Sequence, residues 1–205
     1  MKYETSASPE TLTKTIAALT ARNFHASEVA TKAEALEKIK ALIPKGASVM
    51  NGASQTLEQI GFIDYLKTGE HGWNNVHEQI IAEKDPEKKA ALRKQGILAD
   101  YYLGSVHAVS ENGELVIASA SGSQLPHLAF TSQNIILVVG AQKIAPTLDE
   151  ALARLREYVV PLENKRMADA GQGGTTLAKI LILEQEPAFM NRNVHVLFVH
   201  EVLGF

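Results

Sequence analysis

Apolar residues recur at helical spacing in the first part of the chain. Leu12, Ile16 and Leu19 fall on one face of a predicted helix. A second helix is predicted to begin after Thr31, because Glu34 completes a capping box with that residue. Both segments carry polar residues on their other faces, which is typical of helices that cover a core.

Short runs rich in β-branched residues predict strands between the helical segments. We expect one sheet that contains residues 47–50, 115–118, 135–139, 179–184 and 194–199. The continuous apolar run "NIILVV" is typical of an internal strand buried on both faces. Because helices and strands alternate, we predict a three-layer α/β fold with a largely parallel sheet and helices on both faces. Residues 1–205 should form a single domain, with the helical and extended portion 1–46 packed on it.

The composition restricts the classes of function. The chain of 205 residues is 45% apolar and 21% charged, with a formal net charge of −3. This acidic balance argues against nucleic acid or a membrane surface as the main partner. The sequence has no cysteine, which excludes disulfides, an iron–sulfur cluster and a cysteine nucleophile in this chain. No signal-like or membrane-spanning apolar segment is apparent, so we expect a cytoplasmic protein, and a homo-oligomer remains open.

Three loops follow predicted strands and are rich in small or polar residues. They are 51–56, 119–124 and 140–143. In open α/β sheets, ligands bind beyond the carboxyl ends of the strands, where such loops lie. The alternative is that the hydroxyls only cap helices or close turns, because short Gly/Ser motifs recur by chance.

The predicted ligand is a small anionic metabolite. Gly52 and Gly122 allow close backbone approach, while hydroxyls and a Gln amide supply hydrogen bonds. Lys143, at the end of "NIILVVGAQK", would bind a carboxylate or phosphate as a point charge. The candidate ligand-binding residues are Asn51, Gly52, Ser54, Thr56, Ser121, Gly122, Ser123, Gln124 and Lys143.

Further cations lie downstream of these loops. Three arginines could add positive charge to the site, namely Arg154, Arg156 and Arg166. Because side chains two residues apart on a helix point in different directions, at most one of the first two should point at the site. The histidines lack metal-ligand spacing, so no metal is predicted. We expect no cofactor bound by this chain.

An ordered series of segments resembles the LUD-domain proteins, which include the lactate-utilisation protein C group. The series covers nearly all of 47–205 and comprises "NGASQTLEQIG", "ADYYLGSVHAVSENGELV", "ASGSQLPHLAF", "NIILVVGAQKIAPTLDEALARLREYVVPLENKR" and "VHEVLGF". The resemblance implies a fold like that of ribose-5-phosphate isomerase, glucosamine-6-phosphate deaminase and coenzyme A transferases. In that group the loop after the first strand binds an anion, which would correspond here to Asn51–Thr56.

Two departures from the family pattern bear on function. Many relatives carry Asn-Arg where this chain has Ser123-Gln124, and Asn-Lys where it has Gln142-Lys143. The missing guanidinium changes the charge offered to a ligand, so the substrate cannot be transferred from relatives. Some relatives also have a cysteine cluster near "MADAGQGGTT", where this chain has none.

The tetrapeptide Ser110-Glu111-Asn112-Gly113 has two interpretations. In class I coenzyme A transferases, the glutamate of a Ser-Glu-Asn-Gly motif attacks the acyl thioester, so Glu111 is a candidate nucleophile. Those enzymes also carry an upstream glycine-rich G-x-G-G-F motif, which is missing here. Asn-Gly between two strand-like runs is also a strong hairpin signal, and we favour a turn.

Three functions remain compatible with the sequence. The first, implied by the resemblance, is a subunit or accessory factor in the oxidation of L-lactate to pyruvate, with iron–sulfur partner proteins carrying the electrons. The second is a stand-alone transferase or isomerase for an acyl-coenzyme A or phosphorylated metabolite. The third is a non-catalytic metabolite sensor that uses the same pocket.

Overall fold

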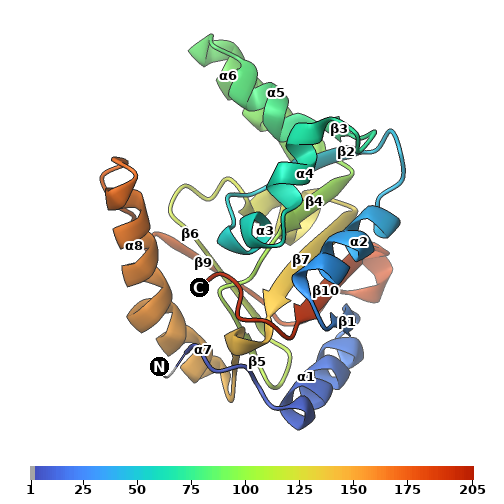
Figure 1. Cartoon of the computed structure of the whole chain (residues 1–205), viewed down its shortest axis with the longest axis vertical. Helices are drawn as coiled ribbons and strands as arrows, with labels where there is room; N and C mark the ends of the chain where they lie inside the picture. Colours follow the sequence, from blue (N-terminus) through green and yellow to red (C-terminus); the bar gives the residue numbers. More distant parts are fainter. Residues whose placement is uncertain (1–2) are drawn as a thin grey trace.

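The computed structural model describes residues 3–205 and centres on a six-stranded parallel sheet (Figure 1). The strand order is β1-β10-β7-β4-β2-β3, and every neighbouring pair runs parallel. The central β7 carries the apolar run expected of an internal strand and is buried along nearly its whole length. The strands are β1 His25–Val29, β2 Ser48–Asn51, β3 Asn74–Asn75, β4 Tyr101–Gly104, β7 Asn134–Gly140 and β10 Asn193–Val199.

Helices pack on both faces of this sheet, as the sequence predicts. One face contacts α2, α3 and α4 through a core that includes Ile39, Leu57 and Phe62. The other face contacts α1 through Leu12 and Leu19, two residues of the predicted apolar stripe. The helices are α1 Pro9–Ala21, α2 Lys32–Leu42, α3 Gln55–Gln59, α4 Phe62–Thr68, α5 Val76–Ala82, α6 Pro86–Gln95, α7 Leu148–Arg154 and α8 Val160–Asp169.

A second sheet corrects the expectation of one sheet. Its order is β8-β5-β6-β9, and β6 pairs antiparallel with both β5 and β9. The expected strands 115–118 and 179–184 therefore belong to this sheet and not to the parallel one. An apolar run predicts burial but not which sheet a strand joins, and the tight turn after β5 imposes the antiparallel pairing. The strands are β5 Ala108–Ser110, β6 Leu115–Ser119, β8 Ile144–Ala145 and β9 Lys179–Leu183.

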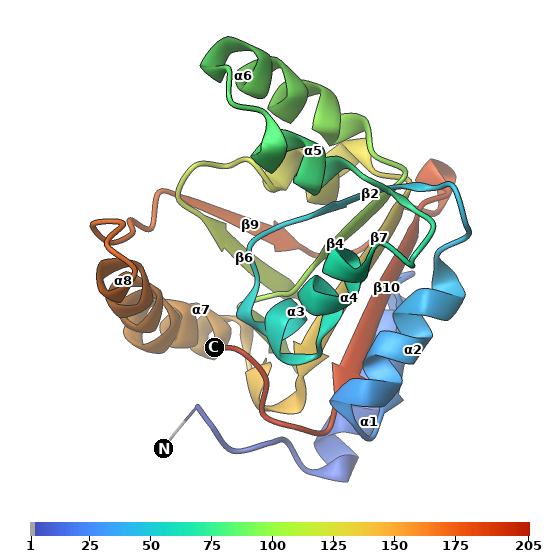
Figure 2. The same cartoon turned by 45° about the horizontal axis from the view of Figure 1, so that its top comes forward.

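The second sheet lies between the parallel sheet and α7. Val109, Leu115 and Ile117 pack with β7 and β10 in one core cluster, while Ala108 and Val116 pack with α7 in another. A π-helical segment, Leu155–Val159, joins α7 to α8. In both views α8 lies away from α2 and β10, at the other side of the molecule (Figure 2). Within 3–205, no helix is long and apolar enough to cross a membrane.

Candidate functional site

A cavity of about 560 Å³ opens where the two sheets and α8 meet. The expected loops 51–56 and 119–124 both line it, although they follow strands of different sheets. Seven of the nine candidate residues line the cavity: Gly52, Ser54, Thr56, Ser121, Ser123, Gln124 and Lys143.

The other two candidates lie beside the cavity without lining it. Asn51 is buried at the end of β2, donates to the carbonyl of Gly52, and has an Oδ1 atom with no hydrogen-bond partner among the described residues. Gly122 has a φ of +87°, and its N–H donates to the Ser119 hydroxyl. A side chain there would press on Lys179, so this glycine shapes the loop.

Lys143 is the charged group at the inner end of the cavity. Its side chain is buried, and Nζ lies 3.1 Å from each of three oxygen atoms, which are Thr56 Oγ1, Ser105 Oγ and the Val106 carbonyl oxygen. All three partners are neutral, and the described residues offer Lys143 no ion pair. The ammonium group is therefore hydrogen-bonded but not neutralised.

Burial, together with the nearby positive charge of Arg154, lowers the pKa of Lys143 to about 7. Arg154 itself is buried below the cavity, where it donates to the His107 carbonyl and faces the ring of Tyr158. Near neutral pH, Lys143 thus exists in both protonation states, and a bound anion would favour the charged one.

His107 contributes a neutral ring to the same cavity. Its Nδ1 atom accepts a hydrogen bond from the Ala118 N–H at 3.0 Å, so in the neutral ring the proton resides on Nε2. Burial, together with the charges of Lys143 and Arg154, lowers its pKa to about 3. At physiological pH His107 can therefore donate a hydrogen bond but does not supply positive charge.

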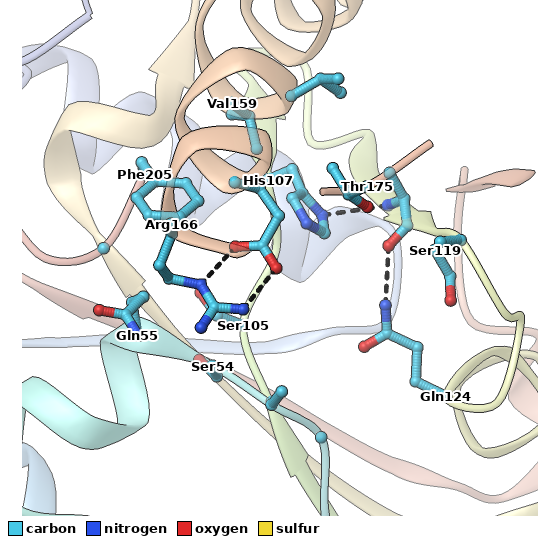
Figure 3. A pocket seen from close by; sticks show the side chains of 18 of the residues that line it. Ser54, Gln55, Ser105, His107, Ser119, Gln124, Val159, Arg166, Thr175 and Phe205 are labelled. Carbon is cyan, nitrogen blue, oxygen red and sulfur yellow. Dashed lines mark hydrogen bonds and ion pairs between the residues drawn. The ribbon is translucent and has the colours of Figure 1, made fainter. Parts of the chain in front are cut away.

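Tyr102 joins the two polar loops. Its hydroxyl donates to Gln124 Oε1 at 3.3 Å. Gln124 Nε2 in turn donates to the Ala118 carbonyl, and this second hydrogen bond is visible in Figure 3. A Cβ atom on Gly52 would overlap the Tyr102 hydroxyl, so only glycine permits this close approach. The ring of Tyr102 also stacks on buried His127, which anchors the junction in the core.

The C-terminal segment covers the Lys143 end of the cavity. Gln142 Nε2 donates to the Leu203 carbonyl at 2.8 Å, and the Gly204 N–H donates to Gln59 Oε1 at 2.7 Å. Gly204 has a φ of +60° and packs against Thr56 and Lys143 so closely that a side chain would overlap the Thr56 hydroxyl. Phe205 then lies at the cavity wall (Figure 3).

The opposite wall comes from α8. Arg166 forms two 2.7 Å hydrogen bonds with Glu163, so its charge is paired inside the wall (Figure 3). Of the three arginines considered from the sequence, Arg166 lines the cavity, while Arg154 is buried beneath it and Arg156 is exposed. The apolar residues Val160 and Met167 line the same wall.

Glu111 lies outside the cavity. It occupies the turn between β5 and β6, where the Gly113 N–H donates to the Ser110 carbonyl, and its carboxylate pairs with Lys14 at 2.8 Å. The Ser-Glu-Asn-Gly segment thus has the hairpin geometry, and its carboxylate is not directed at Lys143 or the polar loops.

Several lining residues were not among the sequence candidates, including Ser105, His107 and Phe205. Ser105 and His107 follow β4, so their position after the carboxyl end of a strand was the available signal. Phe205 had no local signal, because only tertiary contacts bring it to the cavity. No cluster of three or more metal-ligating side chains occurs in the part of the chain that the structure describes.

Comparison with known proteins identifies the family. The LUD-domain profile matches residues 12–199, nearly the whole chain. A crystal structure of a DUF162 family protein from Deinococcus radiodurans is similar in fold, with a TM-score of 0.54 and 13% sequence identity over 93% of this chain and 95% of that one. A search of curated proteins finds no significant match. The chain belongs to the LUD-domain family.

Proposed function

We propose that the cavity binds a small anionic metabolite and that Lys143 supplies the positive charge for it. The observation that carries this proposal is the buried ammonium group, which has three neutral acceptors and no carboxylate partner among the described residues. A buried charge without a counter-charge is costly, and an anion that enters the cavity would remove that cost. The hydroxyls of Ser54 and Ser123 lie along the same cavity and can donate to the anion, whereas the Ser121 hydroxyl already donates to Ser123.

The proposed role is that of a lactate-utilisation-type subunit or accessory factor. The family is associated with lactate utilisation, and both L-lactate and pyruvate are small carboxylates of the kind Lys143 can bind. Because the chain contains no cysteine, electrons from lactate would pass to iron–sulfur partner proteins. Phosphorylated metabolites and coenzyme A esters remain the competing ligands, for an isomerase, a transferase or a sensor.

A binding screen tests the proposal. Calorimetry and thermal shift should be measured with L-lactate, pyruvate, a sugar phosphate and a coenzyme A ester. We expect at least one of these anions to bind, and Lys143→Met to weaken that binding about tenfold or more, because the substitution removes the Coulomb attraction between two unit charges, about 4 kcal/mol at ~4 Å for an effective dielectric constant of ~20. A preference for L-lactate or pyruvate supports the lactate role, whereas a preference for the other compounds supports the alternatives.

Glu111→Gln provides the matched control. It also removes one charge, but from the Lys14 ion pair outside the cavity, so affinity should not change and stability should shift by less than ~0.5 kcal/mol. The proposal is contradicted if none of the anions binds, or if Lys143→Met binds them as tightly as the wild type. A loss of affinity in Glu111→Gln would instead show that the Glu111 carboxylate has a role in ligand binding.

A further inference from the structure

The cavity has two chemically different walls. The side formed by the polar loops presents hydroxyls and an amide, from Ser54, Ser119, Ser121, Ser123 and Gln124. The other side is formed by the π-helical segment, α8, the segment before β9 and the C-terminal segment, and it presents six apolar side chains beside the Glu163–Arg166 pair and the hydroxyls of Thr175 and Thr176. These apolar residues are Leu155, Val159, Val160, Met167, Leu177 and Phe205.

Part of the apolar wall is not buried by the protein itself. Val160, Met167, Leu177 and Phe205 are only half-buried, and α8 contains no fully buried residue. Leu155 and Val159 beneath them belong to the core cluster of the second sheet, so the wall is a continuation of that core. Apolar side chains that line a concave surface gain free energy when a ligand removes them from water.

The size of the cavity exceeds what a three-carbon acid fills. Its volume of about 560 Å³ corresponds to roughly 19 water molecules at ~30 Å³ each. An anion held at Lys143 would contact the polar loops and leave the α8 wall hydrated. Among the positive charges that line the cavity, Lys143 alone lacks an ion-pair partner in the described residues, since Arg166 is already paired with Glu163. The carboxylate of Glu58, on α3, also lines the cavity without an ion pair and accepts a hydrogen bond from Gln55.

We propose that the ligand is an amphipathic anion, with its carboxylate or similar group at Lys143 and an apolar chain against Val160, Met167 and Phe205. The inference rests on the proposed function, because it assumes that Lys143 binds the anionic end. It adds the substrate class: a hydroxy or oxo acid longer than lactate, or an acyl-bearing anion of comparable length.

A series of 2-hydroxy acids with three, four, six and eight carbons tests the inference by calorimetry. Affinity should rise about three- to fourfold for each added methylene until the wall is covered, as expected for burial of ~0.8 kcal/mol per methylene. Met167→Ser should reduce this gain per methylene without changing the affinity for the three-carbon acid. Met190→Ser is the matched control, because Met190 is also half-buried but does not line the cavity.

The outcomes separate the two proposals. If lactate binds through Lys143 but affinity does not rise with chain length, the amphipathic ligand is wrong and the proposed function stands. If no member of the series binds, both are wrong. If the amide of the eight-carbon acid, which carries no charge, binds as tightly as the acid, then Lys143 does not bind a charged end and the proposal of an amphipathic anion is wrong. If Met167→Ser changes the sedimentation of the protein and not its affinity for the longer acids, then the apolar wall contacts another protein molecule and the proposal of an amphipathic ligand is wrong.

Discussion

Lys143 exchanges the hydration of its ammonium group for three neutral oxygen atoms of the protein. Three hydrogen bonds satisfy its donors, but they do not offset the loss of water around a charge. The lowered pKa expresses this cost, since the folded protein holds the proton less tightly than the unfolded chain. The residue that gives the cavity its charge therefore destabilises the fold when no ligand is present.

Replacing Lys143 by Met should stabilise the protein near pH 7, by about 1–3 kcal/mol after allowing for the lost hydrogen bonds. The pKa of Lys143 falls from an ordinary 10.5 to about 7 on folding, so below pH 7 both states are protonated and the cost is fully present. Between pH 7 and 10.5 the folded state alone releases the proton, and wild-type stability rises with pH.

The difference in the free energy of unfolding between Lys143→Met and the wild type should therefore decrease as pH rises from 7 to 10. Urea unfolding of both proteins across this range measures it, and Lys179→Met, at an exposed lysine, serves as the control. If Lys143→Met is less stable than the wild type at pH 7, the buried charge does not destabilise the fold. If the difference in the free energy of unfolding between the two proteins does not change with pH, the pKa of Lys143 is not lowered on folding.

At the scale of elements, the C-terminal segment closes the site by backbone contacts. Gln142 and Gln59 bind the backbone of Leu203 and Gly204, and this holds Phe205 at the cavity wall. The segment follows β10, the neighbour of β7, so the parallel sheet directs its chain end toward the same edge as Lys143.

Gly204→Ala tests the importance of this contact. The substitution combines an unfavourable positive φ with an overlap on the Thr56 hydroxyl, so we expect a loss of about 1–3 kcal/mol and weaker anion binding. Gly46→Ala is a matched control, because Gly46 has a φ of +83° but a Cβ atom added there would have no other atom within 4 Å. It should cost about 1 kcal/mol and leave binding unchanged. Equal affinity in Gly204→Ala and the wild type would show that the segment does not form the site.

At the scale of the whole molecule, the site depends on how two sheets pack. Apolar runs and caps predicted the helices, the buried β7 and the polar loops, because these are encoded locally. The sequence did not reveal that β6 belongs to a second sheet, whose core residues Leu115 and Ile117 bring loop 119–124 against loop 51–56. Phe205 was missed for the same reason, since only tertiary packing places it at the cavity, whereas Ser105 and His107 could have been inferred from their position after β4.

The pH dependence of L-lactate binding shows most directly whether Lys143 provides the charge for an anion. The lactate carboxylate stays ionised above pH 6, so any change in affinity between pH 6 and 9 comes from the protein. We expect the affinity for L-lactate to fall as pH rises through about 7 and binding near pH 8 to take up a proton, seen calorimetrically as an enthalpy that varies with the buffer. Both effects should be absent in Lys143→Met. Binding of L-lactate that is independent of pH and takes up no proton would show that Lys143 does not provide this charge.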